Sequence, residues 1–154
     1  MTDNPSTETH HTPSIDQQLA LRAAAGRLKS EFSNILDEET IERFLDSAHG
    51  QFAHRASVPN FLPLLAERFA QQQLRALARV EGKHDDGKPT VLFLCTHNAG
   101  RSQMAAAFFT NLAGADAVAW SGGSDPSDEV NPVVVQAMCE RGIDIAHEYP
   151  KPFT

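Results

Sequence analysis

Cysteine, basic residues and long apolar runs are all scarce in this chain of 154 residues. The sequence holds two cysteines, Cys95 and Cys139, so any thiol chemistry must use one or both of them. Acidic residues outnumber basic ones by 20 to 13, and the net charge of −7 disfavours nucleic-acid binding through a basic face. No stretch approaches the roughly 18 apolar residues that span a bilayer. The composition therefore points away from nucleic acid and membrane as partners.

Positive charge is scarcest in the second half of the chain. Between residues 89 and 154 the basic residues are Arg101, Arg141 and Lys151, against seven acidic ones. An anion bound by this half must therefore be held by Arg101 and by backbone N–H groups.

One segment has the residues for thiolate chemistry on such an anion. Residues 95–102 read Cys-Thr-His-Asn-Ala-Gly-Arg-Ser, follow the apolar run 91–94 and precede a series of helix formers. A loop between a strand and a helix turns its N–H groups and the positive end of the helix dipole toward one point, where a thiolate is stabilised. The guanidinium of Arg101 can fork onto two oxygens of a tetrahedral anion. We therefore predict an oxyanion-binding loop with Cys95 as nucleophile.

Each residue of the loop has a predicted role. Ser102 can donate its hydroxyl to the sulfur, Gly100 lets the loop coil tightly, and Asn98 tolerates positive φ and can hold the loop's shape. The predicted catalytic residues are Cys95, Arg101 and Ser102. The predicted oxyanion-binding residues are Thr96, His97, Asn98, Ala99, Gly100 and Arg101. The alternative is a chance spacing around a buried, inert Cys95.

The segment 91–108 resembles the arsenate reductases built on the low-molecular-weight protein tyrosine phosphatase fold. The resemblance continues, in family order, through residues 121–124, 131–133, 142–145 and 150–154. Gln103 after the serine is typical of the reductase branch, whereas phosphatases usually carry proline there. The resemblance implies an arsenate reductase in which the Cys95 thiolate attacks arsenate. A low-molecular-weight protein tyrosine phosphatase, which binds phosphate in the same loop, is the alternative function.

The resemblance also implies a fold class: α/β, with a parallel sheet of which this chain carries only part. We expect a strand at 90–94, a helix at 101–112, a parallel strand at 117–121 and a helix at 132–141. The family's acid-proline pair and later strands would follow residue 154, so we expect a truncated chain, part of a longer protein, or completion by a partner chain. Asp125-Pro126 is a D-P pair whose place favours a turn over a general acid.

Such an incomplete domain is expected to have low or altered activity. About 66 residues cannot cover both faces of a parallel sheet, so exposed apolar surface, a homodimer or other oligomer, or partial disorder after Gly142 is expected.

Cysteine usage bears on how the reaction would finish. Cys139 falls in the predicted helix 132–141, where we expect a small buried hydrophobe and no redox partner. An external thiol, mycothiol or glutathione with a redoxin, is therefore predicted as the reductant, without a bound cofactor.

No metal is expected, because His49 and His54 lie five residues apart and not four. The lack of a signal peptide and the need for a reduced thiol predict the cytoplasm.

The first half of the chain reads differently. Residues 1–13 are predicted to be a disordered tail, 14–81 a three-helix bundle, and 82–89 a linker before the phosphatase-like residues 90–154. Apolar stripes predict helices at 15–32, from 38 to about 56, and from about 60 onward. Residues 65–70 resemble the helical extension of some actinobacterial arsenate reductases. A third interpretation is non-enzymatic: the bundle serves dimerisation or partner binding, and the remainder only binds oxyanions.

Overall fold

The computed structural model describes residues 13–53, 61–83 and 86–153. The chain divides into two compact units, Met1–Leu74 and Arg75–Thr154, which are described separately below. The predicted tail 1–13, except for Pro13, lies outside the described residues. So do the predicted end of the second helix near Ala56, His54, and residues 84 and 85 of the predicted linker.

The first unit is helical, as the apolar stripes predict. Its helices are α1 (Ile15–Phe32), α2 (Glu38–Ala53) and the larger part of α3 (Leu62–Val80). The helix α1 begins with a capping box: the Ser14 hydroxyl accepts from the N–H of Gln17 at 3.2 Å, and the Gln17 side chain accepts from the N–H of Ser14 at 3.1 Å. The Asp37 carboxylate accepts from the N–H of Thr40 at 2.8 Å in the same way before α2.

The three helices pack around shared apolar side chains. Leu28 of α1, Ile41 of α2, and Leu62 and Leu74 of α3 are fully buried. Between α2 and α3 the rings of Phe52 and Phe69 meet edge to face, with centroids 5.5 Å apart. In α3 the small residues Ala66 and Ala70 are buried, whereas the larger Leu65 is only half-buried.

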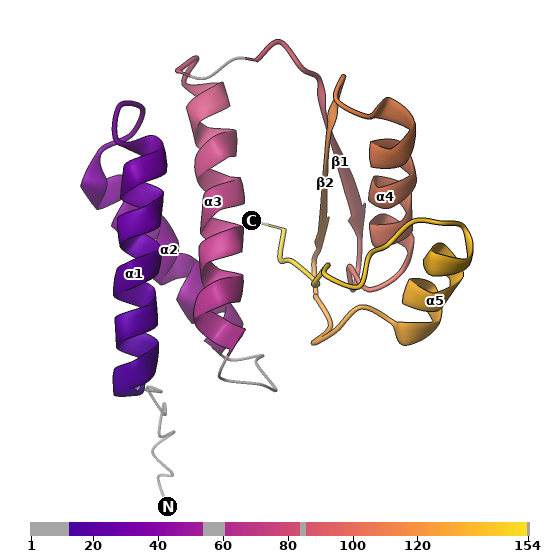
Figure 1. Ribbon diagram of the computed structural model, residues 1–154, viewed down its shortest axis with the longest axis horizontal. Coiled ribbons are helices and arrows are strands. Elements are labelled where there is room, and N and C mark those ends of the chain that lie inside the picture. Colours follow the sequence, from indigo (N-terminus) through magenta and orange to yellow (C-terminus); the bar gives the residue numbers. More distant parts are fainter. Residues whose placement is uncertain (1–12, 54–60, 84–85, 154) are drawn as a thin grey trace, which may run out of the picture. The chain divides into compact units, whose positions relative to one another are not determined.

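The second unit is a β-α-β arrangement followed by a further helix (Figure 1). Its elements are β1 (Thr90–Cys95), α4 (Arg101–Ala113), β2 (Val118–Gly123) and α5 (Pro132–Glu140). The strands pair in parallel from Thr90↔Val118 to Cys95↔Gly123, which confirms the predicted α/β class and topology. β2 begins and ends one to two residues later than predicted. Cys95 and Gly123 therefore stand side by side at the carboxyl edge of the sheet.

The helix α4 packs against both strands of this sheet, and α5 packs against α4. Val91, Phe93 and Cys95 alternate with the exposed Leu92 and Leu94 along β1, and the ring of Phe93 packs against Phe109 of α4 at 5.6 Å. A small core joins α4, α5 and the segments around α5; its members are Val130, Met138 and Ile145, with Met104, Ala107, Val134, Val135 and Ile143 packed against it. The exposed leucines confirm the expectation of exposed apolar surface.

The chain after α5 returns to the end of β2. The N–H of Gly123 donates to the carbonyl of Lys151 and the N–H of Phe153 donates to the carbonyl of Gly123, each at 2.9 Å. Gly123 and Pro152 thus form a parallel bridge beside β2. Because Ile145 and Tyr149 are buried in this segment, it packs as part of the unit. None of the described helices is both long enough and apolar enough to span a membrane.

Candidate active site

The candidate site is the loop between β1 and α4. Cys95 is the last residue of β1, Gly100 is the N-cap of α4, and Arg101 and Ser102 begin that helix. The loop therefore lies at the carboxyl edge of the sheet and at the N-terminus of α4, where the helix dipole favours negative charge.

The six backbone carbonyls of residues 95–100 all accept hydrogen bonds. Their donors are the backbone N–H groups of Ser124 (to Cys95, 3.3 Å), Asp125 (to Thr96, 2.8 Å), Ser127 (to His97, 3.0 Å), Asn131 (to Ala99, 2.9 Å) and Met104 (to Gly100, 2.9 Å), and the side-chain amide of Gln103 (to Asn98, 3.0 Å). Four of these donors belong to the segment 124–131, which wraps around the outside of the loop. The backbone acceptors of the loop are thus all satisfied within the protein, which fixes the course of the loop.

The sulfur of Cys95 is surrounded by hydrogen-bond donors. It lies 2.9 Å from the Ser102 hydroxyl and 3.2 Å from the backbone nitrogen of Asn98. Burial of the thiol is the largest single influence and acts to raise its pKa. The Ser102 hydroxyl and the N–H groups of Ser102, Asn98 and His97 together outweigh it, so the pKa of Cys95 is lowered. The site therefore favours the nucleophilic thiolate.

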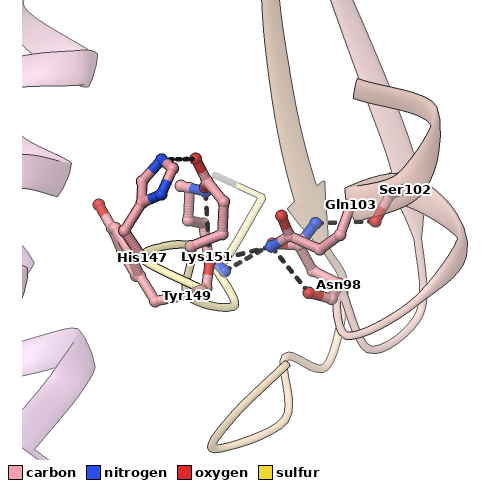
Figure 2. Close-up of polar contacts among 7 residues, drawn as sticks. Asn98, Ser102, Gln103, His147, Tyr149 and Lys151 are labelled. Carbon is pink, nitrogen blue, oxygen red and sulfur yellow. Dashed lines mark hydrogen bonds and ion pairs between the residues drawn. The ribbon is translucent and has the colours of Figure 1, made fainter. Parts of the chain in front are cut away.

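Asn98 holds the loop from its buried side. Its φ is +46°, in the left-handed region that asparagine tolerates better than most residues, and its side chain is fully buried. The side-chain nitrogen donates to the Ser102 hydroxyl at 2.7 Å, and the side-chain oxygen accepts from the N–H of Lys151 at 2.8 Å (Figure 2). Asn98 thus joins the loop, the start of α4 and the chain after α5.

A cavity of about 520 Å³ opens beside the loop. Five predicted residues line it, namely Cys95, His97, Ala99, Gly100 and Arg101, together with Ser127, Glu129, Asn131 and Pro132. The predicted Thr96, Asn98 and Ser102 are not among its lining residues. The sequence analysis did not predict that residues between 127 and 132 line the cavity.

The Asn131-Pro132 pair was the one sequence feature that marked this segment, because it is typical of a helix start. Asn131 caps α5 by accepting from the N–H of Val133 at 2.9 Å.

The Asp125-Pro126 pair belongs to the wrapping segment. The carbonyl of Asp125 lies 2.9 Å from the His97 ring nitrogen Nδ1, and its N–H donates to Thr96. Asp125 is not among the residues that line the cavity. These backbone contacts fit the predicted turn and give no support to Asp125 as a proton donor.

Cys139 corrects the expectation of a buried hydrophobe. It is exposed, whereas the preceding Met138 is 1% exposed and faces the core. Successive helical residues point about 100° apart, so a core-facing Met138 turns Cys139 to solvent. Cys139 also lies seven positions along α5 from the cavity-lining Pro132, about 10 Å along the helix axis.

The fold and this loop define a class of protein, the phosphatase-like α/β domains with a cysteine at the carboxyl edge of the sheet. Residues 90–154 match the family model described as low molecular weight phosphotyrosine protein phosphatase. Residues 21–78 match a second model, the N-terminal domain of protein-tyrosine-phosphatase-like proteins.

Individual relatives agree with these matches. A solved thioredoxin-dependent arsenate reductase from Corynebacterium glutamicum is 39% identical, with a TM-score of 0.84 over 90% of this chain and 69% of that chain. Arsenate reductase 2 of Staphylococcus haemolyticus is 42% identical over 60 residues, and arsenate reductase 1 of Staphylococcus epidermidis is 43% identical over 60 residues. Each alignment covers 39% of this chain and 45% of the relative.

The chain therefore belongs to the arsenate reductases of the low-molecular-weight tyrosine phosphatase fold, with the helical N-terminal domain that some family members carry. It spans less than half the length of the staphylococcal relatives that it matches and about two thirds of the corynebacterial one.

Proposed function

We propose that this chain reduces arsenate, with the thiolate of Cys95 as the nucleophile. The observation that carries the proposal is the lowered pKa of Cys95, produced by the donors around its sulfur at a cavity that Arg101 also lines. A tetrahedral oxyanion placed there would meet the fork of the Arg101 guanidinium and the inward N–H groups of the loop. Thr96, His97, Asn98, Ala99 and Gly100 contribute backbone, and Ser102 stabilises the thiolate.

In the first step the Cys95 sulfur attacks arsenic. A sulfur–arsenic bond forms, an arsenic–oxygen bond breaks, and the oxygen leaves as water after taking up protons. Arsenic remains As(V) at this stage. Among the residues that line the cavity, one carries a carboxyl group, Glu129, and its side chain is exposed. We therefore propose that protons come mainly from solvent and that this step is slow.

In the second step an external thiolate attacks the Cys95 sulfur. A disulfide forms between Cys95 and the reductant, and the electron pair of the sulfur–arsenic bond passes to arsenic, which leaves as As(III) in arsenite. A cavity of about 520 Å³ has room for a second small molecule beside the oxyanion. The exposed position of Cys139, along α5 from the cavity, supports an external reductant over this internal cysteine.

Mycothiol or glutathione with a redoxin remains our proposed reductant. The corynebacterial relative is described as thioredoxin-dependent, which supports a redoxin as the partner that regenerates the thiol. A supply of reduced thiol places the proposed reaction in the cytoplasm. The homodimer and the complementing chain remain predictions.

The test is arsenate-dependent oxidation of NADPH in the presence of the thiol, its redoxin and the matching reductase. We expect turnover in the wild type and in Cys139→Ser, and none in Cys95→Ser, because only Cys95 lies at the cavity. Turnover that survives in Cys95→Ser would refute the proposal. Hydrolysis of an aryl phosphate without arsenate-dependent thiol oxidation would favour the phosphatase alternative, which uses the same oxyanion loop.

A further inference from the structure

Gln103 is a polar residue beside the loop whose side chain is buried, at 2% exposed, and does not line the cavity. A buried amide of this kind needs hydrogen-bond partners within the protein. Its amide nitrogen lies 3.0 Å from each of three oxygens: the carbonyl of Asn98, the side-chain oxygen of Asn98 and the carbonyl of Tyr149 (Figure 2). Two of these are backbone carbonyls, which only accept, and because the amide nitrogen carries two hydrogens, one hydrogen is shared between two of the three oxygens. The nitrogen of Gln103, and not its oxygen, must therefore face them.

The orientation of the Asn98 amide is fixed in the same way. The backbone N–H of Lys151 can only donate, and it lies 2.8 Å from the Asn98 side chain. With Lys151 and Gln103 both donating toward it, that atom of Asn98 must be the oxygen. The Asn98 nitrogen then faces the hydroxyl of Ser102 at 2.7 Å.

This orientation decides what Ser102 can do for the nucleophile. A hydroxyl that accepts a hydrogen bond from Asn98 keeps its own proton for another partner. The remaining partner is the Cys95 sulfur at 2.9 Å. Ser102 therefore donates to the sulfur, which stabilises the thiolate, whereas a Ser102 that accepted from the thiol would stabilise the protonated form.

We propose that Gln103 is a positioning residue for Cys95: with the N–H of Lys151 it orients the Asn98 side chain, and Asn98 in turn makes Ser102 a hydrogen-bond donor to the sulfur. Gln103 touches neither the sulfur nor the cavity. The inference rests on the proposed role of Cys95 as nucleophile. It adds Gln103 and the segment 149–151, which lies about 50 residues further along the chain, to the residues that support that role.

A purely structural role for Gln103 is the competing explanation, since the same amide ties the loop to the segment 149–151. The two roles differ when the Ser102 hydroxyl is removed. If Gln103 has only a structural role, its substitution should still change the alkylation profile of Cys95 in a Ser102→Ala background. If Gln103 acts through the Ser102 hydroxyl, its substitution should have no further effect in that background, so a double-mutant cycle separates the two roles.

The experiment measures the alkylation rate of Cys95 against pH by peptide mass, with Cys139 as internal reference. The proteins are the wild type, Gln103→Leu, Ser102→Ala and the double variant; leucine is close to glutamine in size and has no donor. We expect Gln103→Leu to shift the profile to higher pH and lower the rate near pH 7 about threefold to tenfold, as for the loss of roughly one hydrogen bond to the thiolate. The double variant should match Ser102→Ala.

The matched control is Gln136→Leu, at an exposed glutamine of α5 whose amide donates to Glu140 at 3.3 Å; it should leave the profile unchanged. Thermal unfolding checks that each variant folds. If Gln103→Leu does not fold, Gln103→Asn, which retains the amide but withdraws it by one methylene, is measured in its place with the same expected direction.

Two results would overturn the inference: a wild-type profile in the Gln103 variant, or equal effects of the Gln103 substitution with and without the Ser102 hydroxyl. A wild-type Cys95 that reacts like an ordinary thiol, with a pKa of about 8.5, would instead contradict the proposed function itself. The failure of the inference and the failure of the function are thus distinguishable.

Discussion

Gly123 and Asn98 approach each other so closely that no side chain fits between them. A Cβ atom built on Gly123 would lie 2.9 Å from the backbone nitrogen of Asn98 and 2.6 Å from the carbonyl oxygen of Thr96. Gly123 ends β2 and pairs in register with Cys95. Glycine at this position therefore lets the second strand end directly behind the loop and support it.

Gly123→Ala should damage the loop selectively. The new methyl group would meet backbone atoms, which cannot move aside as a flexible side chain can, so we expect a loss of about 1–3 kcal/mol in the free energy of unfolding. Arsenate should no longer protect Cys95 from alkylation. The control is Gly26→Ala on the exposed face of α1, where nothing lies within 4 Å and alanine should stabilise by roughly 0.5–1 kcal/mol. Full arsenate protection in Gly123→Ala would contradict the close approach.

The lowered pKa of Cys95 makes stability depend on pH. The native thiol ionises at a lower pH than the unfolded one, whose pKa is about 8.5. The stabilisation is complete above the unfolded pKa and is lost as the pH falls through the native pKa. Urea unfolding, followed through the lone Trp120 in β2, should show a wild-type advantage over Cys95→Ser that grows from pH 6 to pH 9. An advantage that is constant over this range would mean that Cys95 titrates alike in both states.

Local sequence patterns were sufficient for the elements and for the loop. The apolar stripes of the first half and the apolar run before Cys95 each concern residues that are close in the chain, and α1, α2 and β1 begin where these patterns predict. The Cys-to-Ser spacing also brings Cys95 and Ser102 within hydrogen-bond distance, because a tight turn into a helix leaves few other arrangements.

Long-range contacts could not be predicted in this way. Nothing in the residues near Asn98 indicates that Lys151, 53 positions later, donates to its side chain.

The exposure of Cys139 was missed for a different reason. The run Val133-Val134-Val135 gives α5 no clear apolar face, and the structure leaves Val133 72% exposed, so the phase of this short helix is set by Met138 in the core.

Arg101→Lys should weaken anion binding although the charge is kept. Lysine is a point donor and cannot fork onto two oxygens of a tetrahedral anion, so we expect the arsenate concentration that half-protects Cys95 to rise about tenfold. The control is Arg141→Lys, at the C-cap of α5 and outside the lining of the cavity, which should have no effect. Unchanged protection in Arg101→Lys would mean that the backbone N–H groups alone hold the anion.

Glu129→Gln should strengthen anion binding. The carboxylate of Glu129 lines the same cavity as Arg101, and a negative charge there repels an arsenate or phosphate anion. Removing it should lower the half-protecting arsenate concentration about twofold to fivefold at low salt, and less at 0.15 M salt, where the Debye length is about 8 Å. Glu140→Gln makes the same change of charge at the far end of α5 and should have a smaller effect. If kcat/KM for arsenate falls in Glu129→Gln although binding tightens, the Glu129 carboxyl also supplies a proton to the leaving oxygen, because loss of repulsion alone cannot raise the barrier measured from free enzyme and free arsenate. Binding that is unchanged at low salt would mean that this carboxylate points away from the bound anion.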